Sequence, residues 1–452
     1  MSIDRAATMG EADAGASSRR ALATVIGIVF IDLLGFGIVI PILPFYVRSF
    51  GVSDVYIGLL AAAYSLMQFL FAPLLGRISD ERGRRPVLML SVLGNAVAWT
   101  FFGLGAQFEL AFGTVGGLGI LFVSRMLAGA MGGNVATAQA YVADVTDPTD
   151  RAGALGLVGA AFGLGFVFGP AIGALFASDA VVGWAAGTFP AFVPTTAFSL
   201  PSFAAAGFSV LAFVATYLTL PEPPRRRTAA VGRVGIVGPF RDALADVDLR
   251  PLVVVFLVAS VAFSGVQVVF VPFVADSFGY DATQAGFLLT YVGVLGVINQ
   301  GFVVGRLSRR FADALLSLAG AILLLVALAT FPFAQSIGSV LPAAISLFGE
   351  GPGLVVLLVV LAILSTGNGL LNVGIATQVS RAASEDQQGS AFGVTQGAGS
   401  LGRTVGPPIM TALYVFAVPA PFVLGAALTV LVVVVLAAVA RRGLPDVFGR
   451  PE

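Results

Sequence analysis

The sequence predicts an all-α integral membrane protein with about twelve transmembrane helices in two six-helix, pseudo-symmetric bundles. Of its 452 residues, 58% are hydrophobic and 11% are charged, and the mean hydropathy of +0.97 lies far above that of soluble domains. Apolar runs of about 20 residues, the length that crosses a bilayer as a helix, recur along the chain. Landmarks of the first half return in the second, which indicates a duplicated unit.

Turn and charge signals separate the expected spans, and one long polar stretch divides them into two groups. We therefore expect a cytoplasmic tail at 1–20, a first bundle at 21–220, a linker at 221–250, a second bundle at 251–440 and a tail at 441–452. The spans are predicted near 21–47, 54–76, 86–107, 116–142, 152–176, 199–220, 251–275, 282–305, 312–334, 353–378, 390–415 and 419–440.

The duplication rests on three landmarks that recur at similar offsets. They are the glycine of a Gly-Pro pair in the fifth and eleventh spans (Gly169 and Gly406, 237 residues apart), the glycine after the second and eighth spans (Gly76 and Gly305, 229 apart) and the proline that closes the first and seventh (Pro44 and Pro272, 228 apart). Repeats of this kind are typical of transporters, whose substrate site lies between the halves.

Arginine supplies every basic side chain, and its distribution predicts the orientation. Arginines concentrate in the loops on the side of the N-terminus, including the run 225–227, whereas the opposite loops carry only Arg48. By the positive-inside rule, both termini are expected to be cytoplasmic in a multi-pass plasma-membrane protein.

The composition also excludes several kinds of chemistry. With 0 Cys and 0 His, the chain has no disulfides, no Cys/His metal site and no imidazole proton relay, so proton chemistry falls to carboxylates. We expect no metal and no cofactor. The net charge of +0 gives no sign of nucleic-acid binding, and the absence of a nucleotide loop or a nucleophile–base pattern argues against an enzyme.

Asp32 is the carboxylate around which the predicted function is organised. It lies eleven residues inside the first apolar run, which begins at Ala21, or roughly 16 Å along a helix and near the middle of a bilayer core of about 30 Å. A charge at that depth is costly unless it faces a wet cavity or a partner, so a functional role is the default interpretation. The alternative is a carboxylate near the headgroups with no role.

The loop after the second span has six charges within a short turn. As a solvated positive-inside loop it would need no further explanation, but Gly76, Asp80, Gly83, Arg84 and Arg85 fit the pattern G-x-x-x-D-x-x-G-R-[KR]. This pattern resembles the loop of the major facilitator superfamily, and the resemblance implies that fold.

In that family the aspartate and arginine of the loop hold the cytoplasmic side of the two halves together. The resemblance assigns this role to Asp80 and Arg84, with Asp144 at the end of the fourth span as an additional partner. The second-half copy has Arg309 in place of Asp80, so an equivalent gate is not expected there.

The fourth span has Arg125 at one end of a face of small residues that ends at Gln139. We expect Arg125 to pair with Asp32, because each stabilises the charge of the other in a medium of low dielectric constant. The alternative is a packing face whose arginine reaches the outer headgroups. The segment resembles the R-x-x-x-G-x-x-G motif of proton antiporters in the superfamily.

In the fifth span, Gly165, Gly169, Pro170 and Gly173 form G-x-x-x-G-P-x-x-G. This pattern resembles the antiporter motif of the superfamily and predicts a close-packing face on a helix that bends.

Together, these segments are similar to the drug/proton antiporter branch, and most of all to the tetracycline/proton antiporters. The resemblance implies that Asp32 and Arg125 match the functional residues of the first and fourth helices. Two departures stand out: Ala98 lies where those proteins have an aspartate in the third span, and the chain has no counterpart to their histidine in the eighth.

Polar residues inside the other spans are candidates for a substrate cavity, although each is individually more typical of an interhelical hydrogen bond. Arg403, about thirteen residues into the eleventh span, either binds an anionic group or caps the helix near Gly406. The further candidates are Tyr64, Gln68, Gln139, Gln267, Asn299, Gln300, Asn368, Asn372 and Gln396.

These observations predict a monomeric, proton-coupled exporter of small, mostly lipophilic molecules, of the multidrug-efflux type, that works by alternating access in the lipid bilayer. An uptake symporter or uniporter of a small metabolite with the same fold is the first alternative. A membrane receptor or scaffold that does not transport is the second. The sequence does not name the substrate.

Overall fold

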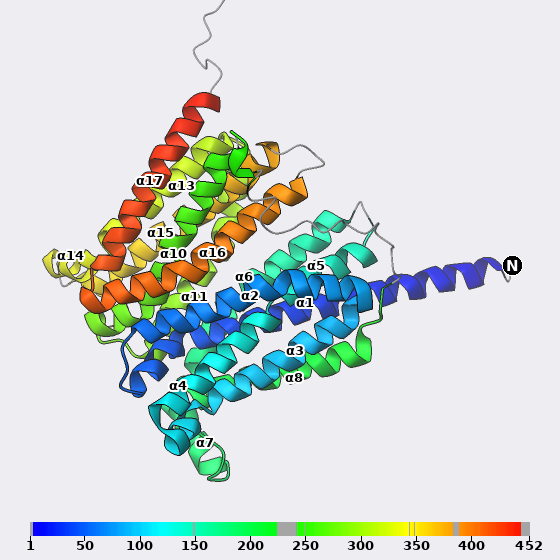
Figure 1. Ribbon diagram of the computed structural model, residues 1–452, viewed down its shortest axis with the longest axis horizontal. Helices are drawn as coiled ribbons and strands as arrows, with labels where there is room; N and C mark the ends of the chain where they lie inside the picture. The colour runs from blue at the N-terminus through cyan, green and yellow to red at the C-terminus, as the bar shows by residue number, and fades with distance from the viewer. Residues whose placement is uncertain are drawn as a thin grey trace, which may run out of the picture. The chain divides into compact units, whose positions relative to one another are not determined.

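The computed structural model describes residues 3–147, 150–223, 241, 243–247, 249–342, 344–347, 349–382 and 388–443, with side chains except at 3–19, 152, 388–390, 392, 442 and 443. In these ranges the protein consists of helices and their connections, with one isolated β-bridge between Leu347 and Glu350 (Figure 1). The all-α membrane fold that the sequence predicts is therefore confirmed.

The chain folds into two compact units. Unit 1 comprises Met1–Gly51, Leu66–Ala229 and Ala282–Thr290, and unit 2 comprises Val52–Ser65, Ala230–Asp281 and Tyr291–Glu452. Two long helices, α2 and α11, therefore contribute to both units. A division of the chain at the linker 221–250 remains a prediction.

Besides the first half of α11, the described part of unit 1 contains eight helices, counting the part of α2 that belongs to it. They are α1 (Ile3–Ser49), α2 (Val55–Arg82), α3 (Arg84–Gly103), α4 (Gly105–Met131), α5 (Asn134–Val145), α6 (Arg151–Ala177), the short α7 (Asp179–Thr188) and α8 (Ser199–Thr219). Because α1 begins at Ile3, most of the stretch expected to be a tail is helical.

The remaining described helices belong to unit 2, apart from the first half of α11. They are α10 (Leu249–Phe278), α11 (Ala282–Ile298), the π-helix η1 (Asn299–Val304), α12 (Gly305–Leu307), α13 (Asp313–Thr330), the 3₁₀-helix η2 (Phe331–Phe333), α14 (Ala334–Val340), α15 (Pro352–Ala382), α16 (Gln388–Phe416) and α17 (Ala420–Gly443).

Within the described residues, 11 helical segments are long and apolar enough to cross a membrane, where the sequence predicts about twelve spans. The segment that differs is α16, which has 29 residues but is not among the eleven. Its glycines, prolines and polar residues, including Arg403, lower its mean hydropathy. The fourth predicted span corresponds to two helices, α4 and α5, that meet at a break.

Glycines set the distance between α1 and α6 in unit 1. A Cβ atom added at Gly165 would lie 2.6 Å from the Cβ atom of Leu33, and one added at Gly169 would lie 2.7 Å from the Cα atom of Gly37. A Cβ atom at Gly173 would lie 2.5 Å from the carbonyl oxygen of Ile38. The two backbones therefore touch, as the antiporter-like motif in this helix predicts.

The same packing occurs between α10 and α16 in unit 2. A Cβ atom added at Gly402 would lie 2.6 Å from the Cβ atom of Ser260, and one added at Gly406 would lie 2.6 Å from the carbonyl oxygen of Val261. The glycine repeat detected in the sequence thus has the same packing role in both units.

Each unit also has a buried aromatic cluster on which its helices converge. In unit 1, Tyr46 of α1 stacks on Phe198 at a centroid distance of 4.5 Å and contacts Phe102 edge-on. In unit 2, Phe331 stacks on Phe422 of α17 at 5.0 Å. Aromatic pairs in this geometry add about 0.5–1.5 kcal/mol each to the burial of their area.

Candidate functional site

The carboxylate of Asp32 on α1 is held by two amide side chains. The Nδ2 atom of Asn95 on α3 donates to Oδ1 at 2.9 Å, and the Nδ2 atom of Asn134 on α5 donates to Oδ2. Asn95 and Asn134 are 5% and 1% exposed, whereas Asp32 is half-buried. We call these three residues the carboxylate site. Two hydrogen-bond donors in a buried setting stabilise the negative charge of the carboxylate. An aspartate in lipid without such donors would not retain that charge.

A helix break brings Asn134 to this position. Gly132 and Gly133 end α4 with φ near −65° and ψ of −7°, and Asn134 is the first residue of α5. A Cβ atom added at Gly133 would lie 2.8 Å from the Cα atom of Ala72 on α2, so glycine is needed for this close approach. Gln68 of α2 donates to the carbonyl oxygen of Gly132 at 3.2 Å. This predicted cavity residue therefore satisfies the backbone at the break.

Arg125 on α4 is 3% exposed and lies against two aromatic rings. Its guanidinium carbon is 5.5 Å from the ring centroid of Trp99 on α3 and 5.9 Å from that of Phe36 on α1. A Cβ atom added at Gly35 would lie 2.8 Å from Nε1 of Trp99, so this glycine makes room for the indole. Cation–π contacts of this kind are worth about 2 kcal/mol when desolvated.

Asp32 and Arg125, which the sequence analysis predicts to form a pair, have different neighbours among the contacts described. Asn95 and Asn134 bind the carboxylate of Asp32, and Arg125 lies over Trp99 and Phe36. A direct pairing of Asp32 with Arg125 remains a prediction. Both side chains nevertheless belong to unit 1, within the bundle formed by its membrane helices.

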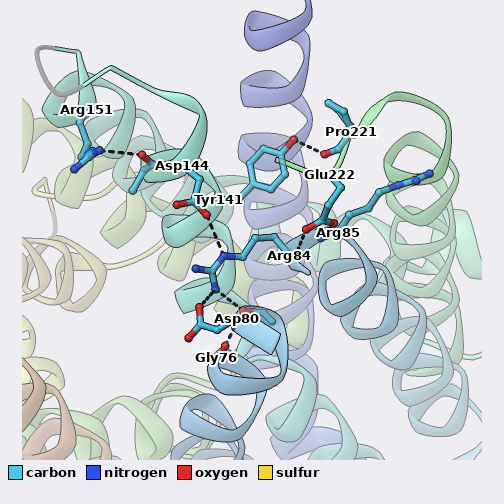
Figure 2. Close-up of polar contacts among 11 residues, drawn as sticks. Gly76, Asp80, Arg84, Arg85, Tyr141, Asp144, Arg151, Pro221 and Glu222 are labelled. Atoms are coloured by element: carbon cyan, nitrogen blue, oxygen red, sulfur yellow. Dashed lines mark hydrogen bonds and ion pairs between the residues drawn. The ribbon is translucent and has the colours of Figure 1, made fainter. Parts of the chain in front are cut away.

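At the arginine-rich end of unit 1, Arg84 joins three helices (Figure 2). Its guanidinium forms an ion pair with Asp80 of α2 and another with Asp144 of α5, with Nε 3.2 Å from Oδ2 in the latter pair. Nη1 also donates to Oγ of Ser79 at 2.7 Å, and that hydroxyl donates to the carbonyl oxygen of Gly76. The structure thus brings together Asp80 and Arg84 of the loop pattern and Asp144, the additional partner named from the fourth span.

Glu222, which the sequence analysis did not single out, caps the N-terminus of α3. Its carboxylate accepts hydrogen bonds from the backbone N–H groups of Arg84 at 2.7 Å and Arg85 at 2.9 Å. Gly83, at φ 112°, makes the turn, and a Cβ atom there would lie 2.6 Å from Oε1 of Glu222. Because α3 begins with two arginines, which is unfavourable for the helix dipole, this carboxylate supplies the missing negative charge.

Further contacts fix the chain beyond α8 to this end. The hydroxyl of Tyr141 donates to the carbonyl oxygen of Pro221 at 2.7 Å (Figure 2). Nη2 of Arg85 donates to the carbonyl oxygen of Tyr217, near the end of α8, at 2.7 Å. The residues that lead from α8 toward the predicted linker are therefore bound to α3 and α5.

Replacing Glu222 with Ala is expected to lower the free energy of unfolding by about 1 kcal/mol, as for the loss of other helix N-caps. Thermal unfolding of the purified protein measures this change. Glu81→Ala is the matched control, because Glu81 forms only an exposed pair with Arg77 at 3.5 Å. Equal unfolding temperatures for the two variants would contradict the capping role.

The remaining cavity candidates lie in varied surroundings. Asn299 is buried at the start of η1 and donates to the hydroxyls of Ser365 at 3.3 Å and Thr366 at 3.1 Å. Arg403 donates to Oγ of Ser400, one turn earlier in α16, at 3.0 Å. Asn372 donates a hydrogen bond to Asn368. The side chains of Tyr64 and Gln267 are half-buried, and those of Gln139, Gln300 and Gln396 are exposed. Their roles in a substrate cavity remain predictions.

The sequence reasoning missed three residues next to Asp32 and Arg125, the two residues predicted to be functional: Asn95, Asn134 and Trp99. A signal was present for the asparagines, because an amide in the middle of an apolar span is itself unusual. Ala98, at the position where the resemblance leads one to expect an acid, is fully buried, and Asn95 lies one turn before it and contacts Asp32.

Comparison with known proteins gives a consistent result. Residues 25–355 match the family model described as Major Facilitator Superfamily. The chain is 31% identical over 402 residues to the tetracycline resistance protein, class C, of Escherichia coli, covering 88% of this chain and 90% of that protein. It is 27% identical over 395 residues to multidrug resistance protein 1 of Bacillus subtilis, covering 87% and 90%.

Solved structures show the same architecture. The crystal structure of a human organic anion transporter aligns with a TM-score of 0.63 and 23% sequence identity, and the alignment covers 93% of this chain and 99% of that one. At this identity the likeness shows the fold.

Proposed function

Because the chain belongs to the Major Facilitator Superfamily, and so is a membrane transporter of small molecules rather than an enzyme, we propose that it is a proton-coupled exporter of small, mostly lipophilic molecules. The names of its relatives, for tetracycline resistance and multidrug resistance, support export of drug-like compounds. Alternating access by the two halves is the proposed mode of transport.

The carboxylate site is the observation that carries the proposal. A half-buried aspartate inside a membrane helix, held by two neutral amides, changes the charge of its surroundings each time it binds or loses a proton. The amides donate to the charged form. To serve the protonated form, one amide must turn its oxygen toward the new hydroxyl, and the Oδ1 atoms of Asn95 and Asn134 are buried without a hydrogen-bond partner among the described residues. Proton binding would thus rearrange contacts between α1, α3 and α5.

The ion pairs of Arg84 lie within unit 1, and we propose that this cluster takes part in the gate that the resemblance implies. An arginine that binds two carboxylates, one of them exposed to water, forms contacts that are stable yet separate at a cost of a few kcal/mol, as a gate in a transport cycle requires. We place this end and both termini in the cytoplasm of a plasma-membrane protein, on the strength of the arginine distribution. The protein is proposed to act as a monomer.

The experiment that tests this function compares cells that express the chain with cells that do not. Accumulation of a panel of fluorescent lipophilic dyes and antibiotics is measured with and without a protonophore. We expect lower accumulation of at least one compound, and loss of the difference when the protonophore is added. Unchanged accumulation of every compound would overturn multidrug export, and accumulation that rises with expression would indicate uptake instead.

A further inference from the structure

Unit 2 has an ion pair between a buried aspartate and an exposed arginine at the ends of α13 and α15. The Nη2 atom of Arg381, in the last turn of α15, lies 3.0 Å from Oδ2 of Asp313, the first residue of α13. Only 9% of the Asp313 side chain is exposed, whereas 74% of the Arg381 side chain is. A buried carboxylate whose counterion comes from another helix ties the two helices together.

The positions of this pair match those of a pair in unit 1. Asp313 follows Arg84 by 229 residues, the offset between the loop glycines Gly76 and Gly305. Arg381 follows Asp144 by 237 residues, the offset between the Gly-Pro pairs of the fifth and eleventh spans. The two ion pairs therefore occupy equivalent places in the duplicated halves, with the acid and the base exchanged.

The arrangement in unit 2, with the acid at the start of the helix, suits the helix dipole better than the arrangement in unit 1. A carboxylate in the first turn of a helix is favourable, and Asp313 occupies that position in α13. In α3 the corresponding residue is Arg84, and Glu222 has to supply the carboxylate from beyond α8. Unit 2 obtains the helix-end charge and the ion pair from the same aspartate.

Helices α13 and α15 also pack closely about one turn further along from the ion pair. A Cβ atom added at Gly374 of α15 would lie 2.7 Å from the backbone nitrogen of Ser317 in α13. Nε2 of Gln378 donates to Oγ of Ser317 at 2.8 Å, and Ser317 is fully buried. Separation of the two helix ends would expose Ser317 first.

We propose that Asp313 and Arg381 are the second-half counterpart of the Arg84–Asp144 pair, with reversed polarity, and that they position the end of α15 against α13 during transport. The loop copy with Arg309 in place of Asp80 remains as the sequence analysis describes it, and the proposed counterpart lies instead at the ends of α13 and α15. The role in transport rests on the transport function of the family, and the ion pair itself does not depend on the identity of the substrate.

The test uses Ser317→Cys as a buried reporter, since the full chain has 0 Cys and the introduced thiol is unique. The rate of maleimide labelling in membranes is measured in Asp313→Asn, Arg381→Gln and the exchanged double variant Asp313→Arg with Arg381→Asp. Each single change is expected to accelerate labelling about tenfold, because it removes the ion pair that the buried Asp313 side chain forms. The double variant is expected to return to within about threefold of the parent, the remainder reflecting an arginine at the N-terminus of α13.

Two controls make the result specific. Arg309→Gln removes an exposed arginine from the same end of unit 2 and should leave labelling of Ser317→Cys unchanged. Ser91→Cys, buried in α3 of unit 1, should not respond to Arg381→Gln. A double variant that is labelled as fast as the single variants would overturn the pairing.

Efflux of a transported dye, measured in the same variants without the reporter, tests the positioning role. We expect efflux to fall about tenfold in the single variants and to recover in the exchanged variant, at matched amounts of protein in the membrane. Single variants with accelerated labelling and unchanged efflux would overturn a role in transport. If no dye is exported even by the parent chain, the labelling series still decides whether the pair exists.

Discussion

Replacing Asp32 with Asn is expected to reduce pH-gradient-driven efflux to the level of membranes that lack the protein. Asparagine keeps the size of the side chain and its ability to hydrogen-bond with Asn95 and Asn134, but it neither binds nor releases a proton. The variant should therefore fold and reach the membrane in normal amounts. It should also retain exchange of substrate across the membrane in the absence of a gradient, because that reaction requires no net proton movement.

Everted vesicles with an imposed pH gradient measure the first quantity, and exchange of labelled substrate measures the second. Asp179→Asn is the control, since this aspartate is exposed in the first turn of the short helix α7. Efflux by Asp32→Asn at the parental rate would remove Asp32 from the coupling mechanism. Loss of both efflux and exchange, with normal amounts of protein, would assign Asp32 to substrate binding instead.

Replacing Gly169 with Leu is expected to have the largest effect on stability. The Cβ atom alone would lie 2.7 Å from the Cα atom of Gly37, so α1 and α6 would have to separate along the seam that Gly165 and Gly173 also line. Overpacking of this kind costs about 3 kcal/mol or more. We expect the amount of folded protein in the membrane to fall several-fold or more, since a loss of about 1–2 kcal/mol already changes the abundance of a protein in cells several-fold.

Gly156→Leu on the same helix provides the matched control. A Cβ atom at Gly156 would meet no other atom within 4 Å, and the residue is exposed. Both variants add the same side chain to α6, so any effect of helix propensity or hydrophobicity is common to them. Similar membrane levels and similar unfolding temperatures for the two variants would show that the seam tolerates separation.

Much of the fold could be read from the sequence because bilayer thickness fixes the length of each apolar span. Asp32 was conspicuous for the same reason, as a charge inside such a span. The loop from Gly76 to Arg85 and the acid at the end of the fourth span pointed to a real cluster, in which Arg84 binds Asp80 and Asp144.

The partners of Asp32 could not be read in this way. Asn95 and Asn134 are uncharged, and their position next to Asp32 depends on the packing of α1, α3 and α5. The break after Gly132 also escaped detection, since two consecutive glycines occur in continuous membrane helices as well. Trp99 approaches Arg125 only because Gly35 lacks a side chain, which is a property of the assembled bundle.

Helix α5 gives the break a mechanical consequence. Its first residue, Asn134, binds the carboxylate of Asp32, and Asp144, ten residues later, binds Arg84. Ten residues of α-helix span about 15 Å, and a helix of this length moves as a rigid rod. Gly132 and Gly133 precede it, and a tilt of α5 about these glycines is expected to move Asp144 much farther than Asn134, because Asn134 lies next to them. One short rod thus has an end at each of two chemically distinct sites.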